Sequence, residues 1–134
     1  MKSKTILFSG RFDRPHLGHF ITTKKLGQQY KKVIVVVLDY PESYFPLCTR
    51  LSILKEAMEN VPGEYEIVAN ATHFGKITIE ELKVFKFDVY GAGNLQVLKH
   101  IESLGIECVH VPRHPEYAAS DDVKYHKIKN VMED

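Results

Sequence analysis

The sequence predicts an α/β protein built on a doubly wound parallel sheet of about five strands. Short apolar runs rich in β-branched residues alternate with helical patterns about five times along the chain. The clearest run, residues 33–38 (VIVVVL), is continuously apolar, which is typical of a strand buried on both faces of a parallel sheet. A length of 134 residues fits one core, so we expect residues 1–134 to form a single domain. The expected architecture is Rossmann-like, with helices on both faces of the sheet.

The first half of the chain predicts two strands and two helices. Residues 5–8 (TILF) form the first strand, which Ser9 and Gly10 end. A helix begins near residues 16–18, because apolar side chains then recur at helical spacing. The second strand is the run at 33–38. Two prolines make residues 40–46 a loop, and a second helical pattern over 51–61 stops at a Pro-Gly pair.

The second half repeats this alternation. Residues 65–68 form a modest third strand, and Thr78 with Glu81 has the form of a capping box that opens a short helix through Phe85. The remaining elements are a strand at 87–90, a helix over 95–104 closed by a glycine, a strand at 106–111 and a last helix from Ser120 to about Met132.

Composition excludes several classes of partner and location. Eighteen basic and seventeen acidic residues give a formal net charge of +1, so we expect no nucleic-acid partner. No apolar run approaches the roughly 20 residues that cross a bilayer, and no signal-peptide core follows Met1, so we expect no membrane contact. Cys48 and Cys108 lack CxxC spacing, which favours a reduced, cytoplasmic protein.

The loop that follows the first strand carries the strongest functional signal. Ligands of doubly wound sheets bind beyond the carboxyl ends of the strands, and this loop reads SGRFDRPHLGH. His16 and His19 share one face of the predicted helix at its positive end, and Gly18 lets a phosphate approach the backbone amides. With Arg11 and Arg14 beside them, these residues predict an anion site. The alternatives are two polar histidines that cap a surface helix, or a zinc pair that lacks further ligands at recognisable spacing.

The segment Gly10-Arg11-Phe12-Asp13, followed by His16-Leu17-Gly18-His19, resembles the GxFDxxHxGH signature of the cytidylyltransferase-like nucleotidyltransferases. This superfamily includes glycerol-3-phosphate cytidylyltransferase, phosphopantetheine adenylyltransferase and the archaeal nicotinamide-mononucleotide adenylyltransferases. The resemblance covers nearly the whole chain. It implies an enzyme in which an acceptor phosphate attacks the α-phosphate of ATP or CTP and releases pyrophosphate, without a covalent enzyme intermediate. It also implies Mg²⁺ bound with the NTP, no dedicated metal ligands from the protein, and a homodimer.

The resemblance assigns roles residue by residue. The catalytic set comprises four residues: His16, His19, Arg11 and Ser120. The nucleotide-binding set comprises Gly10, Arg11, Phe12, His16, Gly18, His19, Gly91, Gly93, Asn94, Arg113, Tyr117 and Ser120. The acceptor-binding set comprises Asp13, Arg14 and Arg50. A surface position on an amphipathic helix is the alternative for Arg50, and a plain helix N-cap is the alternative for Ser120.

The sequence also departs from the family pattern. Where relatives carry two or three hydroxyl residues before the last helix, residues 117–120 (YAAS) keep only that of Ser120, and residues 39–49 contain no basic side chain. A GDD-like motif is absent at 91–93, which with Gly93-Asn94 and the Gly10-Arg11-Phe12 opening favours ATP over CTP. These departures leave two alternatives open: a degenerate member that binds a nucleotide as a sensor, and a nucleotide-binding interaction module. The acceptor is not predicted.

Overall fold

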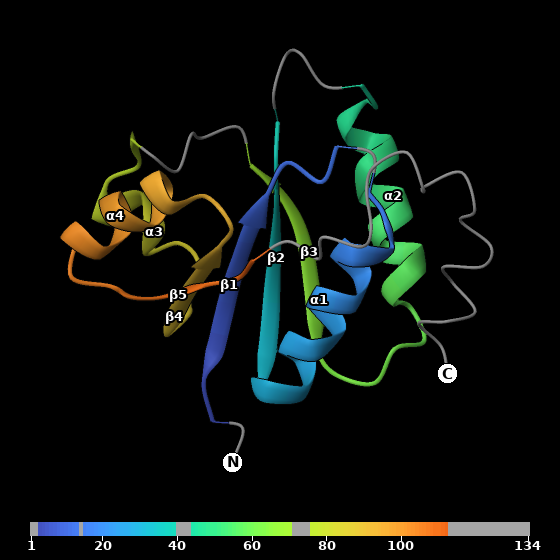
Figure 1. Ribbon diagram of the computed structural model, residues 1–134, viewed down its shortest axis with the longest axis horizontal. Coiled ribbons are helices and arrows are strands. Elements are labelled where there is room, and N and C mark those ends of the chain that lie inside the picture. Colours follow the sequence, from blue (N-terminus) through green and yellow to red (C-terminus); the bar gives the residue numbers. More distant parts are fainter. Residues whose placement is uncertain (1–2, 14, 40–43, 71–75, 113–134) are drawn as a thin grey trace.

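The computed structural model describes residues 3–13, 15–39, 44–70 and 76–112 (Figure 1). Strands and helices alternate along these residues, as predicted. The strands are β1 (Thr5–Gly10), β2 (Lys32–Leu38), β3 (Tyr65–Asn70), β4 (Val89–Ala92) and β5 (Glu107–His110). The helices are α1 (Leu17–Gln29), α2 (Leu47–Met58), α3 (Ile79–Leu82) and α4 (Leu95–Ser103).

The strands form one parallel sheet in the order β3-β2-β1-β4-β5. The chain builds outward from β1 to β3 and then returns to add β4 and β5 on the other side of β1. Figure 1 shows α1 and α2 on one face of the sheet and α3 and α4 on the other. The predicted doubly wound, Rossmann-like fold is therefore confirmed, and the strand order reverses between β1 and β4.

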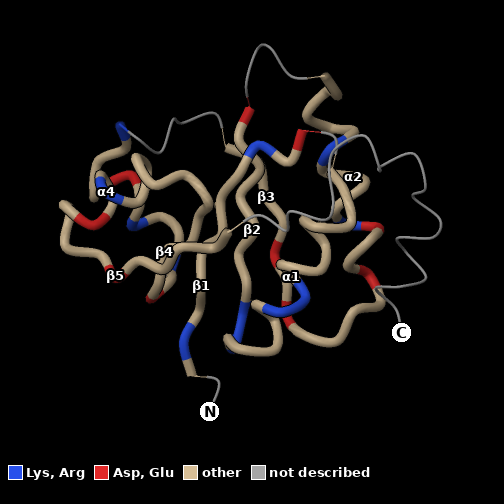
Figure 2. Tube along the Cα trace, viewed as in Figure 1, with Lys and Arg blue, Asp and Glu red and all other residues tan. Residues whose placement is uncertain are grey.

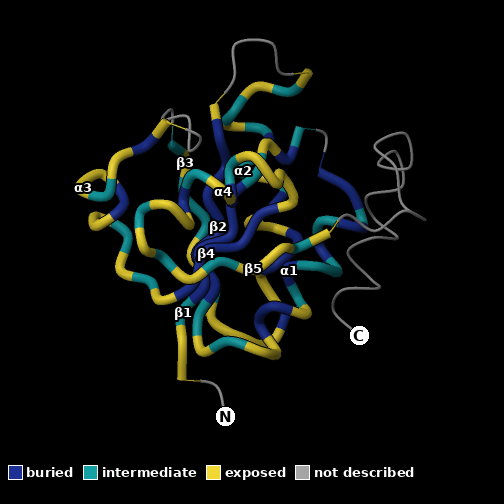
Figure 3. Tube along the Cα trace, turned by 60° about the vertical axis from the view of Figure 1, so that its left-hand side comes forward, coloured by how far each residue is buried: buried dark blue, intermediate teal, exposed yellow. Residues whose placement is uncertain are grey.

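Two apolar clusters, one on each face of the sheet, hold the layers together. Alternate residues of a strand point to opposite faces, so Val33, Val35 and Val37 pack under α1 and α2 while Ile34 and Val36 pack on the other face. Figure 3 shows the buried residues gathered along the central strands. Burial on both faces explains why the run at 33–38 is apolar without interruption.

Several element ends differ from the predictions. β1 continues to Gly10 because Ser9 and Gly10 pair with β2. α2 begins at Leu47 rather than residue 51, and α3 ends at Leu82 rather than Phe85, with a turn in which the Phe85 N–H donates to the Leu82 carbonyl. Such boundaries depend on ladder and turn hydrogen bonds that apolar spacing does not report. The helix predicted from Ser120 lies outside the described residues.

The described residues carry both signs of charge in similar measure, as the near-neutral net charge of the sequence leads one to expect. Figure 2 shows Lys and Arg interspersed with Asp and Glu along the described chain. No helix within the described ranges combines the length and the apolar character needed to cross a membrane.

Candidate functional site

The loop from β1 to α1 lies at the carboxyl end of the sheet, beside the reversal of strand order (Figure 1). Phe12 occupies this loop with a φ of 48° and is 3% exposed. Its ring folds back over Gly10, where a Cβ atom would lie only 3.2 Å from the ring. A side chain at Gly10 would therefore fit only if the buried Phe12 ring moved by a few tenths of an ångström.

His16 and His19 form a reciprocal cap at the start of α1. The Gly18 N–H donates to Nδ1 of His16 at 3.1 Å, and the His16 N–H donates to Nδ1 of His19 at 3.2 Å. The two rings stack with their centroids 3.8 Å apart. A neutral imidazole has one N–H and one acceptor nitrogen. Because both Nδ1 atoms accept, each neutral ring carries its proton on Nε2, where it is a donor.

In this cap, two backbone N–H groups at the start of α1 are already hydrogen-bonded within the protein. The Gly18 N–H is bonded to His16 Nδ1, and the His19 N–H donates to the His16 carbonyl at 2.9 Å. The imidazole of His16 therefore accepts the Gly18 N–H at Nδ1 and can donate a hydrogen bond from Nε2. Hydrogen bonds joined in this way reinforce one another. The Gly18 N–H, one of the backbone amides predicted to meet a phosphate, thus donates to the His16 ring.

His19 is also held by its neighbours on the loop and the helix. The Phe12 ring meets the His19 ring edge-on, with centroids 5.1 Å apart and planes at 75°. Thr23, which is fully buried, donates its hydroxyl to the His19 carbonyl at 2.8 Å. The ring contact is not visible in the motif spacing alone, because it involves Phe12 in its left-handed conformation.

Arg50 is buried, and its predicted alternative as a surface residue is wrong. Its side chain is 0% exposed. Nε donates to the Phe45 carbonyl at 3.1 Å, and Nη1 donates to the carbonyls of Arg11 at 2.7 Å and Leu38 at 2.9 Å. A guanidinium group has five N–H donors, which suits it to several carbonyls at the ends of strands and loops. Arg50 thereby joins the loop after β1, the end of β2 and the segment before α2.

Asp13 completes this connection from the other side. Its carboxylate accepts the N–H groups of Tyr44 at 2.7 Å and Phe45 at 3.0 Å. Burial acts to raise the pKa of Asp13, but these two bonds and the charges of Arg50 and Arg11 outweigh it and hold that pKa below its usual value. Asp13 and Arg50, both assigned to the acceptor by the resemblance, are thus engaged with backbone groups of the protein.

The turn from β4 to α4 lies on the other side of the strand-order reversal. A Cβ atom on Gly91 would lie 3.0 Å from Ile6 and Val111, and one on Gly93 would lie 3.2 Å from the Val111 carbonyl. Asn94 caps α4, accepting the N–H groups of residues 96 and 97. A side chain at either position would therefore be crowded by its neighbours.

A buried hydroxyl pair lies between β1 and β4, and the sequence reasoning missed it. Ser9 and Tyr90 are hydrogen-bonded through their hydroxyl groups, and both are at most 5% exposed. Each residue belongs to a run that predicts a strand, but their meeting depends on the register of two strands far apart in sequence. No motif signals this pair.

Of the predicted site residues that the structure describes, most lie in one region. Gly10, Arg11, Phe12, His16, Gly18 and His19 share the loop and the first turn of α1, and Arg50 contacts that loop. Arg14, Arg113, Tyr117 and Ser120 lie outside the described residues. Within the described ranges, no group of three or more His, Cys, Asp and Glu side chains could hold a metal ion.

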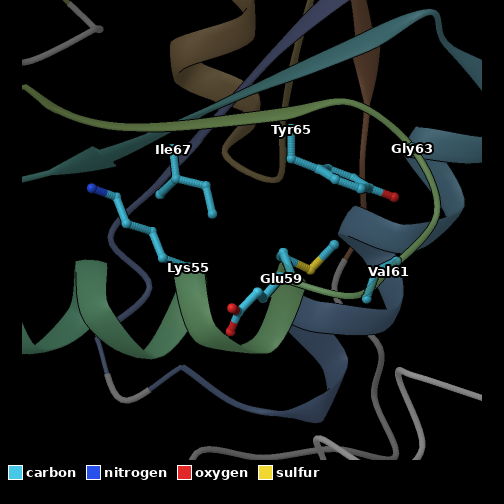
Figure 4. Close-up of a pocket in the computed structure, with 7 residues that line it drawn as sticks. Lys55, Glu59, Val61, Gly63, Tyr65 and Ile67 are labelled. Carbon is cyan, nitrogen blue, oxygen red and sulfur yellow. The ribbon is translucent and has the colours of Figure 1, made fainter.

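A pocket lies away from this region, between the end of α2 and the start of β3. Figure 4 shows Lys55 from α2 and Glu59, which directly follows α2, on the side of the pocket opposite Tyr65 and Ile67 from β3. Tyr65 begins β3, so the pocket lies toward the amino ends of the strands, whereas ligands of doubly wound sheets bind at the carboxyl ends. We therefore place the candidate site at the histidine pair rather than in this pocket.

Comparisons with known proteins agree with this geometry. The sequence profile of the cytidylyltransferase-like family matches residues 7–84, more than half of the chain. Among solved structures, the lipopolysaccharide core biosynthesis protein of Thermoplasma volcanium is similar, with a TM-score of 0.61, 21% identity, and coverage of 83% of this chain and 98% of that one.

A second solved structure is the bifunctional NMN adenylyltransferase/ADP ribose pyrophosphatase of Francisella tularensis, complexed with AMP and a manganese ion. Its TM-score is 0.61 at 18% identity, and the match covers 92% of this chain but 41% of that one. At such identities the two likenesses show the fold alone. A search of curated proteins gave no match.

Proposed function

The chain belongs to the cytidylyltransferase-like family of nucleotidyltransferases, and from this premise we propose that it transfers a nucleotidyl group from an NTP to a phosphorylated small molecule. One observation carries the proposal: the stacked pair of His16 and His19 at the start of α1, whose Nδ1 atoms both accept backbone N–H groups. This arrangement supplies two Nε2–H donors at the carboxyl end of the sheet.

The proposed reaction is a single displacement at phosphorus. A phosphate oxygen of the acceptor attacks the α-phosphorus of the NTP, and the bond from the α-phosphorus to the oxygen that bridges to the β-phosphorus breaks. Negative charge grows on the α-phosphate oxygens and on the departing pyrophosphate. Donors fixed in place before the reaction stabilise this charge more than the ground state, and that difference accelerates the reaction. We assign this task to His16 and His19, with Arg11 and Ser120 as further contacts to the phosphates.

We propose ATP as the nucleotide, on the resemblance of Gly10-Arg11-Phe12 and Gly93-Asn94 to the adenylyltransferases. The base and ribose would lie against the turn from β4 to α4, where close packing leaves backbone groups to contact them. Arg113 and Tyr117 would complete the nucleotide site, and the resemblance assigns Asp13, Arg14 and Arg50 to the acceptor. Turnover with CTP and not with ATP would contradict this choice.

The metal would enter with the substrate. Asp13, the carboxylate of the loop, already accepts two backbone N–H groups, and the described residues offer no cluster that fits a metal ion. We propose that Mg²⁺ is carried mainly by the phosphates of the NTP, which can supply most of its oxygen ligands. We also propose a homodimer, which light scattering of the full chain would test.

The proposal is tested by pyrophosphate release. The full chain is first screened for stabilisation by ATP and CTP, since a ligand at 100 times its dissociation constant adds about 2.7 kcal/mol. Pyrophosphate release is then measured with the stabilising nucleotide over a panel of phosphorylated metabolites. We expect release that depends on both substrates and is lost in a His16→Ala/His19→Ala variant that still folds. Release that persists in this variant would contradict the proposed role of the histidines.

A nucleotide sensor is the second candidate, and a specific observation favours it. Residues 117–120 keep one hydroxyl, and residues 39–49 contain no basic side chain, so two hydroxyls and one basic side chain that relatives carry are missing. A sensor would be stabilised by ATP but would release no pyrophosphate with any acceptor. The same screen therefore separates the two functions.

A further inference from the structure

We propose that Arg50 and Phe12 are positioning residues that fix the imidazole of His19, and that Arg50 does not itself contact the acceptor. This inference rests on the proposed function, because it names how the donor pair of that site is held. Three links carry it: the engagement of Arg50, the backbone conformation of Phe12, and the ring contact between Phe12 and His19.

The first link is that the guanidinium of Arg50 is committed to the protein itself. It is fully buried and donates to carbonyls of Phe45, Arg11 and Leu38. Its Nη2 lies 3.9 Å from Asp39 and, among the described residues, makes no hydrogen bond. To reach an acceptor phosphate, Arg50 would have to give up hydrogen bonds to these three carbonyls. A role in holding these three segments together accounts for its burial.

The second link is the left-handed backbone of Phe12. Residues other than Gly, Asn and Asp rarely adopt a φ of 48°, and such a conformation persists where its surroundings impose it. Here both neighbours are anchored. The Arg11 carbonyl accepts from Arg50 Nη1 at 2.7 Å, and the Asp13 carboxylate accepts from the N–H groups of Tyr44 and Phe45. Arg50 and Asp13 therefore hold Phe12 in this conformation from either side.

The third link passes from Phe12 to the histidine pair. The left-handed turn sends the Phe12 ring back over Gly10 and into the core, edge-on to Phe8 at 5.5 Å and to His19 at 5.1 Å. His19 stacks in turn on His16. The His19 imidazole is thus held by aromatic contacts as well as by its Nδ1 bond. Loss of the anchor at Arg11 would release Phe12 and with it the orientation of this donor.

The experiment reads the His19 ring directly, in the full chain and without any substrate. Long-range ¹H–¹⁵N spectra of the histidine rings are recorded for the wild type, Arg50→Lys and Phe12→Leu. We expect His19 to show the Nε2–H tautomer in the wild type. In both variants we expect its Nδ1 and Nε2 resonances to shift toward each other as the two tautomers exchange. His100 and His110 bond carbonyls elsewhere in the protein and are the internal references, which should not move.

A destabilised control separates positioning from general loosening. Ile101 is fully buried on the opposite face of the sheet, so Ile101→Val weakens the core without touching the loop. Its His19 spectrum should match that of the wild type. Pyrophosphate release should fall by about 10²-fold in Arg50→Lys and Phe12→Leu, the loss typical of a misplaced reacting group, while the KM for the phosphorylated acceptor stays within about twofold.

Two results would overturn the inference. One is a folded Arg50→Lys and a folded Phe12→Leu that both keep the wild-type His19 spectrum. The other is a rise in the KM for the acceptor in Arg50→Lys with an unchanged kcat, which would make Arg50 an acceptor contact. If Arg50→Lys does not fold, Phe12→Leu decides, because it leaves Arg50 in place. If the wild type releases no pyrophosphate, the proposed function fails, but the spectra still decide the positioning roles.

Discussion

Nδ1 of His19 accepts the backbone N–H of His16, while Nδ1 of His16 accepts the N–H of Gly18, so the two histidines together cap the start of α1. The usual capping box uses Ser or Thr at the first position and Glu or Gln three residues later. Two imidazoles can replace that box only while both are neutral, because a protonated ring has no acceptor nitrogen. The same atoms that start α1 therefore fix which nitrogen of each ring remains a donor.

Replacing His16 by Asn should separate the cap from the donor. Asn is among the best N-cap residues and can accept the Gly18 N–H, but it has no group at the position of Nε2. We expect His16→Asn to keep the free energy of unfolding within about 1 kcal/mol of the wild type and to lower kcat by about 10²–10³-fold. Chemical denaturation and pyrophosphate release measure the two effects. His16→Ala is the comparison, since it loses the cap as well, at a cost of about 0.5–2 kcal/mol. Wild-type turnover in His16→Asn would leave His16 a capping role only.

Removing the second donor should reduce catalysis more than binding. We expect His19→Ala to lower kcat by about 10²–10³-fold, with a smaller effect on ATP affinity because Arg11 and other contacts to the nucleotide remain. Titration calorimetry with ATP and pyrophosphate release under saturating ATP separate the two quantities. A wild-type chain that binds ATP without turnover, and loses that binding in His19→Ala, would support the sensor function instead.

Asp13 should contribute to stability at neutral pH and lose that contribution in acid. Its pKa in the folded chain is below its usual value, so folding favours the carboxylate, and its contribution is lost as the pH falls from about 4 through the lower folded-state pKa. We expect Asp13→Asn to be less stable than the wild type at pH 7, and the difference to shrink as the pH falls below about 4. Unfolding curves between pH 3 and pH 7 test this. Glu59→Gln, at an exposed position after α2, makes the same charge change and should not reproduce the trend.

We expect that position 27 holds glycine because the Tyr65 side chain leaves no room for a Cβ atom, and not because the helix needs a glycine there. A Cβ atom at Gly27 would lie 2.0 Å from the Tyr65 hydroxyl oxygen and 2.6 Å from the adjacent ring carbon. Crowding of this kind costs about 1–3 kcal/mol, whereas alanine is favoured over glycine within a helix by about 1 kcal/mol. We expect Gly27→Ala to destabilise the wild type and to stabilise a Tyr65→Ala background. Thermal unfolding of the four proteins gives the coupling energy, and equal effects in both backgrounds would contradict the contact.

Substitutions at Ser120 and Ala119 test whether the Ser120 hydroxyl contacts the nucleotide or only caps the predicted last helix. If Ser120 contacts an NTP phosphate, Ser120→Ala should reduce kcat as well as stability, and Ala119→Ser should raise activity. If Ser120 is only an N-cap, its loss should cost about 0.5–2 kcal/mol with unaltered kinetics in the folded fraction. Denaturation and pyrophosphate release on the same preparations distinguish these outcomes.

The fold and the position of the histidine pair at a helix start could be predicted because their signals are local. The run at 33–38 indicated a central parallel strand, and the spacing of His16 and His19 placed a pair of donors at a helix start. The sequence also indicates that Arg50 is buried, although the same pattern is compatible with a surface position. Arg50 lies four residues before Leu54 and seven before Ala57, which places it on the buried face of α2. A charged residue at such a position is usually taken to be at the surface, unless its partners are known.

The remaining contacts could not be predicted, because they join segments that are distant in sequence. The bonds of Asp13 to Tyr44 and Phe45 depend on how two loops meet. The left-handed turn at Phe12 likewise depends on anchors outside its own segment, and nothing in the local sequence (no glycine or asparagine at that position) indicates it.

The bond between Ser9 and Tyr90 has a consequence for how the sheet moves. β1 pairs with β2 over six residue pairs but with β4 over only three, so the two halves of the sheet meet along a seam with few ladder hydrogen bonds. Local opening costs least where such bonds are few. The Ser9–Tyr90 bond crosses this seam near its carboxyl end. A nucleotide bound across the same seam would bridge two cooperative units, and its binding energy would slow amide hydrogen exchange in both halves.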